Sequence, residues 1–163
     1  MKLINIGKIL RQHGVKGGMK VSSDFKYKKE AFKIGNTIYV LDKPYKITSY
    51  SYAGGGQADI CYLEGINTID DVIVIKQNTI YIDKDSLNIN EILDEELLNM
   101  EVYLNSELIG TVYDIQTGIN PLLMVKYNGK NVYIPRQDIY IKNIDVDNNK
   151  IELTEDARGL LWK

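Results

Sequence analysis

GKILRQHGVKGGMKV, residues 7–21, reads as a strand, a glycine-rich turn and a second strand. The run LINIGKIL that leads into the turn opens with alternating apolar and polar residues, as expected for a half-buried strand. Gly14, Gly17 and Gly18 lie in the turn, where glycine permits positive φ values and close approach of another backbone. The stretch therefore predicts two strands joined by a tight turn at the start of the chain.

Similar short runs fill most of the remaining sequence. The first half contains NTIYVLD (36–42), YKITSYSYA (45–53), ADICYLEGI (58–66) and NTIYIDK (78–84). The second half contains EVYLNSELIGTVYDIQTG (101–118), LLMVKYNGKNVYIP (122–135) and IDVDNNKIEL (144–153). Many brief strands between frequent turns favour a barrel or sandwich. We predict an all-β fold of two small antiparallel β-barrels in tandem, joined by a short, partly helical linker.

Three positions in the second half predict where strands turn or end. Asn128-Gly129 supplies the two positive-φ residues of a type I′ hairpin turn. Asn148-Asn149 predicts a second hairpin. Pro135 is expected to end a strand, because it has no amide hydrogen to donate.

Two segments have helical features. In residues 67–77, Thr68 is a candidate N-cap, with Asp70 and Asp71 in the first turn. In residues 88–100, apolar residues recur at helical spacing and acids crowd one side. We expect a short helix in each.

The net charge of -2 conceals two oppositely charged halves. Residues 1–84 carry 13 Lys and Arg against 8 Asp and Glu, a net of +5. Residues 85–163 carry 7 against 14, a net of -7. The basic half suits a polyanionic partner, although lysines that merely solvate strand faces would produce the same count. The change of sign predicts a first domain over residues 1–84, a linker over 85–96 and a second domain over 97–163.

Bulk features indicate a soluble protein of the cytoplasm. The composition, 44% hydrophobic and 26% charged, is ordinary for a globular chain. No apolar run approaches the roughly 20 residues of a bilayer span. The N-terminus lacks the features of a signal peptide, and a single cysteine cannot form an internal disulfide. We expect a monomer without a membrane partner.

The groups needed for catalysis are scarce. A zinc site needs three or four ligands, but the chain has one histidine, His13, and one cysteine, Cys61. Cys61 lies in an alternating strand and is expected in the core. Gly54-Gly55-Gly56 lacks the Lys-Ser/Thr of a phosphate-binding loop. We predict no catalytic residue, no metal and no cofactor.

The first turn and its flanks carry the strongest candidate binding site, which we call the basic loop. Its cations and exposed amides suit phosphate contacts, which position a protein on nucleic acid but read little sequence. A tight barrel corner with solvated lysines is the structural alternative. The basic loop comprises Lys8, Arg11, His13, Gly14, Lys16, Gly17 and Lys20.

The same stretch, extended to Phe25, resembles the opening signature of the ribosome maturation factor RimM family. The matching places are Gly7, His13-Gly14, Lys16, Gly17, Val21 and Asp24-Phe25. The resemblance continues through FKIGNTIYV and CYLEGINTIDDVIVIKQNTIYI. It resumes in ELIGTVYDI, PLLMVKYNGKNVYIP, IKNIDVDNNKIEL and the terminal GLL, which are similar to the PRC-barrel half of the family.

This resemblance implies a six-stranded N-terminal barrel followed by a PRC-barrel. It implies a non-enzymatic ribosome assembly factor that binds the immature small subunit and promotes late maturation of its head and rRNA processing. The implied partners are ribosomal protein nineteen of the subunit head and nearby rRNA.

The sequence departs from the family in two places. Many relatives carry a glutamate where this chain has Gly18. Relatives often have two tyrosines ahead of the LIG motif, in the linker that meets the ribosomal protein, and Leu97-Leu98 takes that place here. These leucines could contact the ribosomal protein, or could dock the linker onto the second barrel.

The acidic second half is expected to meet a basic ribosomal protein. Its exposed candidates are the two loops around Asn120-Pro121 and Pro135-Arg136-Gln137. Two other functions stay open from the residues. One is a small barrel enzyme that binds an anion or a flavin, and the other is a PRC-type interaction module unconnected with ribosomes.

Overall fold

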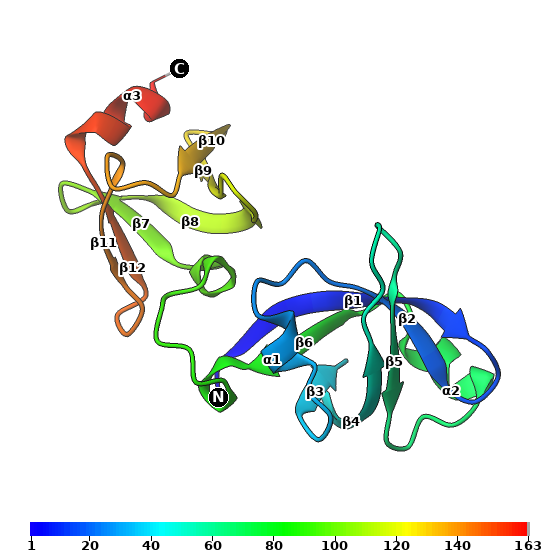
Figure 1. Cartoon of the computed structure of the whole chain (residues 1–163). Coiled ribbons are helices and arrows are strands. Elements are labelled where there is room, and N and C mark those ends of the chain that lie inside the picture. The colour runs from blue at the N-terminus through cyan, green and yellow to red at the C-terminus, as the bar shows by residue number, and fades with distance from the viewer. Residues whose placement is uncertain (163) are drawn as a thin grey trace. The chain divides into compact units, whose positions relative to one another are not determined.

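The computed structural model describes residues 1–162 and divides the chain into two compact units, Met1–Asn90 and Glu91–Lys163. Strands are the main regular structure of each unit (Figure 1). The division falls inside the stretch predicted as a linker. The prediction of an all-β chain of two tandem β units is confirmed.

The first unit is a closed six-stranded barrel in the order β1-β2-β5-β4-β3-β6, with every pair antiparallel. Alternate residues face inward and are buried, among them Ile4, Ile6, Met19 and Cys61. The strands are β1 (Leu3–His13), β2 (Gly18–Ser22), β3 (Thr37–Val40), β4 (Lys43–Ser51), β5 (Asp59–Leu63) and β6 (Thr79–Asp83).

Helices in this unit are short: α1 (Lys28–Ala31), α2 (Ile69–Ile75) and a 3-10 turn (Lys84–Ser86). The predicted helix at Thr68 is confirmed. Thr68 Oγ1 accepts a hydrogen bond from the Asp71 amide at 3.2 Å, and the Asp71 carboxylate accepts one from the Thr68 amide at 3.2 Å. Among residues 1–162, no helix is long and apolar enough to cross a bilayer.

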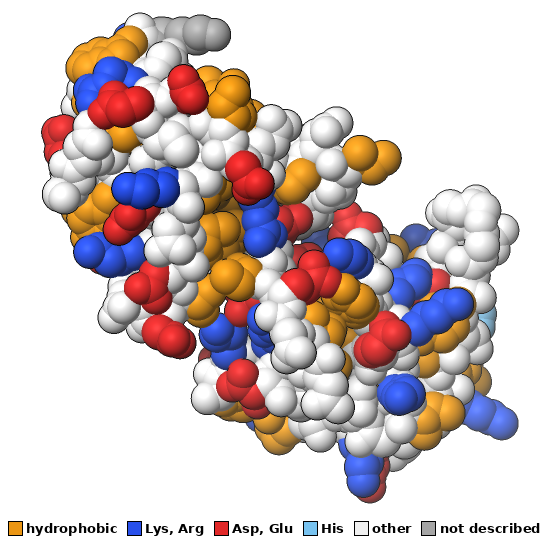
Figure 2. Space-filling view, turned by 60° about the vertical axis from the view of Figure 1, so that its left-hand side comes forward, with side chains coloured by type: hydrophobic (Ala, Val, Ile, Leu, Met, Phe, Trp, Pro, Cys, Tyr) orange, Lys and Arg blue, Asp and Glu red, His pale blue; other side chains and the backbone are white. Residues whose placement is uncertain are grey.

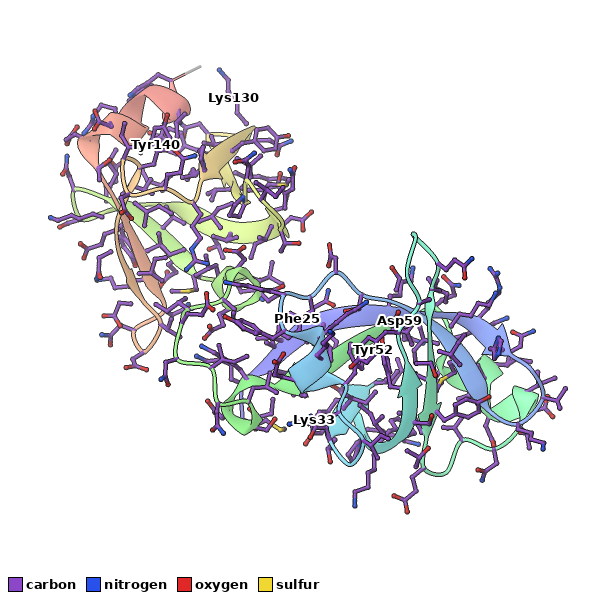
Figure 3. All side chains as sticks on the ribbon, viewed as in Figure 1. Phe25, Lys33, Tyr52, Asp59, Lys130 and Tyr140 are labelled. Atoms are coloured by element: carbon purple, nitrogen blue, oxygen red, sulfur yellow. The ribbon has the colours of Figure 1, made fainter. Side chains whose placement is uncertain are left out.

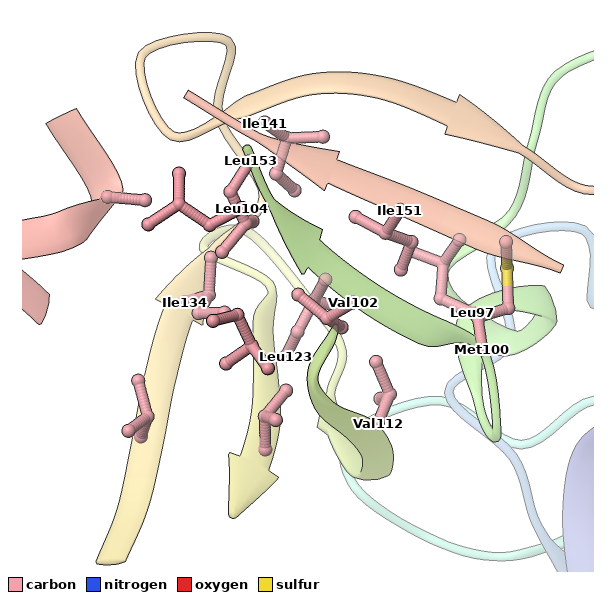
Figure 4. Close-up of a cluster of buried hydrophobic side chains, with 14 of the residues drawn as sticks. Leu97, Met100, Val102, Leu104, Val112, Leu123, Ile134, Ile141, Ile151 and Leu153 are labelled. Carbon is pink, nitrogen blue, oxygen red and sulfur yellow. The ribbon is translucent and has the colours of Figure 1, made fainter. Parts of the chain in front are cut away.

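The second unit is a six-stranded sheet in the order β10-β9-β8-β7-β12-β11. Strands lie on both sides of a buried apolar cluster that includes Leu97, Val102, Leu123 and Ile151 (Figure 4). Its strands are β7 (Glu101–Leu104), β8 (Glu107–Gln116), β9 (Leu122–Tyr127), β10 (Lys130–Pro135), β11 (Ile141–Asp145) and β12 (Lys150–Leu153).

One strand pair of the second unit differs from the prediction. β7 and β12 run parallel, with Ile151 beside Val102, whereas an all-antiparallel arrangement was expected. A parallel pair needs a long crossover connection, here the whole β8–β11 segment. No local pattern in either strand marks the direction of its neighbour.

The predicted turns of the second unit are present. Asn128 and Gly129 have φ values of 50° and 77° and join β9 to β10. β10 ends at Pro135. Asn149 has a φ of 57° in the loop between β11 and β12.

The predicted helix over residues 88–100 is wrong. Only a 3-10 turn forms there, Asp94–Leu97. Leu93, Leu97 and Met100 are buried at helical spacing, but Leu93 and Leu98 have extended backbones, with ψ values of 151° and 136°. Helical backbone is therefore confined to the turn between them. Two short helical elements at the other end of the chain, Glu155–Ala157 and α3 (Arg158–Leu161), were not predicted.

Candidate functional site

The basic loop comprises the connection between β1 and β2 together with residues of both adjoining strands. Five of its members, Lys8, Arg11, His13, Gly14 and Lys16, are exposed. Lys20 is half-buried and Gly17 is buried. The structure therefore presents most of this candidate site to solvent, but not Gly17, whose part is structural.

Two cations of the basic loop face each other across the hairpin. Arg11 and Lys20 are directly paired on β1 and β2, a position where like charges destabilise a sheet. Within residues 1–162, Lys8, Arg11, Lys16 and Lys20 form no ion pair. A bound polyanion would relieve this repulsion.

Gly17 explains why the basic loop has a defined shape. Its φ is +89°, and a Cβ there would lie 2.1 Å from the Ile66 carbonyl oxygen. The loop therefore packs directly against the backbone that leads into α2. Gly14 has a φ of +70° but open space around it. Only one of the two glycines is needed for a close contact.

A buried carboxylate network lies elsewhere on the first barrel and was not predicted. Asp59, at the start of β5, is only 2% exposed. Its Oδ2 accepts hydrogen bonds from Lys28 Nζ at 2.8 Å and Tyr50 Oη at 2.7 Å, and its Oδ1 accepts one from the Ala53 amide at 2.9 Å. Figure 3 labels Asp59 together with Tyr52 on the same barrel.

Burial alone would raise the pKa of Asp59, but the hydrogen bonds from Lys28, Tyr50 and the Ala53 amide lower it below its usual value. The hydrogen bond between Tyr50 and Asp59 has the opposite effect on the pKa of Tyr50. Its phenol pKa is raised by burial and by the adjacent carboxylate. Asp59 is therefore held as an anion that ties α1 to β4 and β5.

Three aromatic rings form a row beside this network, the first two stacked and the third tilted. The Phe32 and Tyr50 rings lie 4.5 Å apart with 17° between their planes, and Tyr52 lies 4.8 Å beyond Tyr50. Lys28 Nζ lies 5.7 Å from the centre of the Tyr52 ring. Phe32 is 1% exposed and Tyr52 is 44% exposed, so the stack runs from the core to the surface.

The sequence did not predict this arrangement, because Lys28 is 31 positions from Asp59 and lies on another element. The alternation of Tyr50 and Tyr52 in a strand was visible, and so were the lysines of residues 26–33. Nothing in the sequence showed that Asp59 would join them.

The two leucines proposed for partner contact have different environments. Leu97 is 0% exposed and belongs to the core of the second unit. Its side chain offers no surface to a partner, so its inclusion in the candidate site is not supported. Leu98 is 44% exposed. Of the pair, only Leu98 stays a candidate contact.

The loops around Pro121 and Pro135 are brought together. The Arg136 amide donates a hydrogen bond to the Pro121 carbonyl at 3.0 Å. The Arg136 guanidinium pairs with the Asp94 carboxylate and donates to the Ile92 carbonyl at 2.6 Å. Arg136 therefore holds the chain entering this unit, and its charge is compensated. Asn120 and Gln137 remain exposed.

Cys61 lies in the core of the first barrel. Cys61 is 1% exposed, and burial raises the pKa of its thiol to about 12. No cluster of three or more His, Cys, Asp or Glu suited to a metal occurs within residues 1–162.

On the face shown in Figure 2, acidic and basic side chains are interspersed.

A closed barrel followed by a second, separate β unit defines a two-domain all-β protein whose candidate sites lie on exposed loops and strand faces. Family models match both parts. Residues 4–87 match the RimM N-terminal domain, and residues 94–157 match the RimM PRC barrel domain. The chain therefore belongs to the RimM family.

The chain is similar along its length to curated relatives named ribosome maturation factor RimM. It is 30% identical to that of Bacillus mycoides, with 98% of this chain and 99% of the relative covered. It is 29% identical to that of Bacillus pumilus, with 97% and 96% covered. The solved N-terminal domain of RimM from Thermus thermophilus covers 56% of this chain and all of that one, at 17% identity and a TM-score of 0.46.

Proposed function

We propose that this protein is a non-enzymatic assembly factor that binds the immature small ribosomal subunit and promotes late maturation of its head. The family match over both domains carries the proposal. Binding would favour one conformation of the subunit head, so the protein would act by population shift without making or breaking bonds. Such a role would place the protein in the cytoplasm. We propose that it acts there as a monomer.

The first barrel would contact rRNA through the basic loop. Lys8, Arg11 and Lys16 are exposed and form no ion pair within residues 1–162. Arg11 gains further from a phosphate, because Lys20 faces it across the hairpin. Contacts of this kind release counterions, so they weaken steeply as salt rises.

The second unit would contact a basic ribosomal protein of the head, ribosomal protein nineteen. Residues 91–163 carry 7 Lys and Arg against 13 Asp and Glu, a net of -6, which would accelerate encounter with a cationic partner. The exposed contact candidates are Leu98, Asn120 and Gln137, with the half-buried Pro121 and Pro135 beside them. Arg136 would support these loops through Asp94 instead of meeting the partner.

Co-sedimentation with immature small subunits, mature small subunits and complete ribosomes tests the proposal. We expect enrichment on immature or free small subunits and none on complete ribosomes. Equal binding to every particle that disappears at moderate salt would reduce the basic loop to a nonspecific patch, and would contradict the proposal.

The rRNA contact is tested by a triple variant, Lys8→Ala, Arg11→Ala and Lys16→Ala. We expect weaker particle binding and a salt slope reduced by about one for each phosphate that the variant no longer binds. The control removes three exposed lysines elsewhere on the barrel, Lys33, Lys43 and Lys46, and so changes the net charge equally. Equal effects of both variants would show that only overall charge matters.

A further inference from the structure

We propose that the outer end of the Phe32-Tyr50-Tyr52 stack is a second RNA contact, at which the Tyr52 ring receives an unpaired base. This inference rests on the proposed function for its RNA partner. It assigns a different surface and a different mode of contact from the basic loop, namely stacking in place of phosphate attraction alone.

The geometry of the stack leaves its last position open. Phe32 and Tyr50 are nearly parallel at 4.5 Å, and Tyr52 continues the row at 4.8 Å with a tilt of 57°. Tyr52 is the most exposed of the three rings, at 44%, whereas Tyr50 is half-buried and Phe32 is buried. Bases stack on exposed aromatic side chains without sequence preference, because every base has a π face.

Cations lie next to the open ring. Lys28 Nζ is 5.7 Å from the Tyr52 ring centre, and Lys28 also lines a depression of about 530 Å³ formed by residues 23–30. Lys26 and Lys29 line the same depression, along with Asp24 and Glu30. With Lys28 paired to Asp59, the remaining lysines and acids of the depression balance, so stacking on Tyr52, and not net charge, carries the proposed contact.

The buried network fixes the ring before any partner arrives. Asp59 holds Lys28 at 2.8 Å and Tyr50 at 2.7 Å, and its contact with the Ala53 amide secures the chain next to Tyr52. Because Asp59 compensates the charge of Lys28, Lys28 contributes by holding its place beside the Tyr52 ring and not by attracting phosphate. A preformed platform loses little conformational entropy on binding.

An unpaired nucleotide fits this surface better than an acidic peptide. Both would meet the lysines, but only a flat ring system makes use of an exposed aromatic face at the end of a stack. Single-stranded RNA is recognised in this way, by bases splayed onto aromatic side chains. Duplex RNA keeps its bases paired and would gain only the phosphate contacts.

The test measures binding of the full-length protein to a single-stranded RNA oligonucleotide, to its duplex and to poly-glutamate. For Tyr52→Ala we expect about tenfold weaker binding to the single strand, an unchanged salt slope and unchanged duplex binding. Tyr52→Phe retains the ring and should bind like the wild type. Tyr81→Ala, which removes a tyrosine 38% exposed on β6, is the matched control.

Several outcomes would overturn the inference. They are wild-type affinity of Tyr52→Ala for the single strand, equal losses for Tyr52→Ala and Tyr81→Ala, or tighter binding of poly-glutamate than of RNA. Circular dichroism of each variant excludes unfolding as the cause of a loss. Failure of the wild type to select immature subunits would instead refute the proposed function, and would leave Tyr52-dependent RNA binding intact.

Discussion

Gly14 and Gly17 both adopt positive φ in the β1–β2 turn, but only Gly17 approaches another part of the backbone. The sequence predicted both as turn residues and assigned both to a binding site. The structure separates their roles, because the Ile66 carbonyl occupies the space that a Cβ on Gly17 would need. The distance between two segments that are 49 positions apart decides this difference.

Gly17→Ala is therefore expected to destabilise the first barrel by at least about 2 kcal/mol, from the positive φ and the steric clash together. Gly14→Ala has the same kind of backbone but no clash, and should cost about 1 kcal/mol. Urea unfolding of both variants gives the comparison. Equal losses would show that the contact with Ile66 adds nothing.

Asp59 gives the first barrel a pH dependence. Its pKa in the folded protein is lowered, so its contribution to stability is present above the unfolded-state pKa of about 4. That contribution is lost as the pH falls through the folded-state pKa, because protonation breaks the pairing with Lys28. We expect the free energy of unfolding to decline over this acidic range.

In Asp59→Asn this decline should be smaller, and the variant should lose about 1–3 kcal/mol at neutral pH, because Lys28 and Tyr50 lose a charged acceptor. Asp42→Asn, an exposed acid in the turn between β3 and β4, is the control. Urea titrations from pH 7 to pH 3 measure both. A parallel pH profile for Asp59→Asn and the wild type would contradict the assignment.

Among the elements, α2 and the segment before β7 both have the sequence features of a helix, but only α2 forms an α-helix. Thr68 and Asp71 form a reciprocal cap, and within α2 the buried Val72 and Ile75 are three apart, on one helical face. In the segment before β7, Leu93 and Leu98 have extended backbones on either side of the 3-10 turn Asp94–Leu97. Apolar residues at helical spacing are therefore not sufficient to extend that turn into a helix.

Leu97→Ala is expected to destabilise the second unit by about 2–5 kcal/mol, because it leaves a cavity in the core. Leu98→Ala should change stability by no more than about 0.5 kcal/mol, because that side chain is 44% exposed. Chemical denaturation measures both. If Leu98 contacts the ribosomal protein, Leu98→Ala should also weaken co-sedimentation with immature subunits, and an unchanged affinity would remove it from the site.

For the whole molecule, the division into Met1–Asn90 and Glu91–Lys163 places the basic loop and the Tyr52 stack in one unit. The acidic residues 91–163 form the other, with a core of its own. Two folded units with opposite charge suit two chemically different partners, such as RNA and a basic protein.

Fragments 1–90 and 91–163 are expected to fold separately, because each contains a complete set of paired strands. Well-dispersed amide NMR spectra of each fragment would confirm this. Fragment 1–90 should keep the salt-dependent RNA affinity of the full chain, whereas fragment 91–163 should show none. RNA binding by fragment 91–163 would contradict the division of roles by charge.

Features that depend on near neighbours could be predicted from the sequence. Alternation located the strands of both units, Asn128-Gly129 and Pro135 located a turn and a strand end, and Thr68 located the start of α2. Each of these follows from backbone preferences within a few residues. The charge reversal between the halves was equally readable, because it is a property of composition.

Tertiary structure alone decided which distant residues meet. Closure of the barrel brings Asp59 to Lys28 and Tyr50, and extends the Phe32 ring into a stack that ends at Tyr52. Formation of the second sheet places β12 parallel to β7 and draws Leu97 out of reach of any partner. These contacts depend on how whole strands pair and pack, and strand pairing is set by burial of the complete core, which no local pattern encodes.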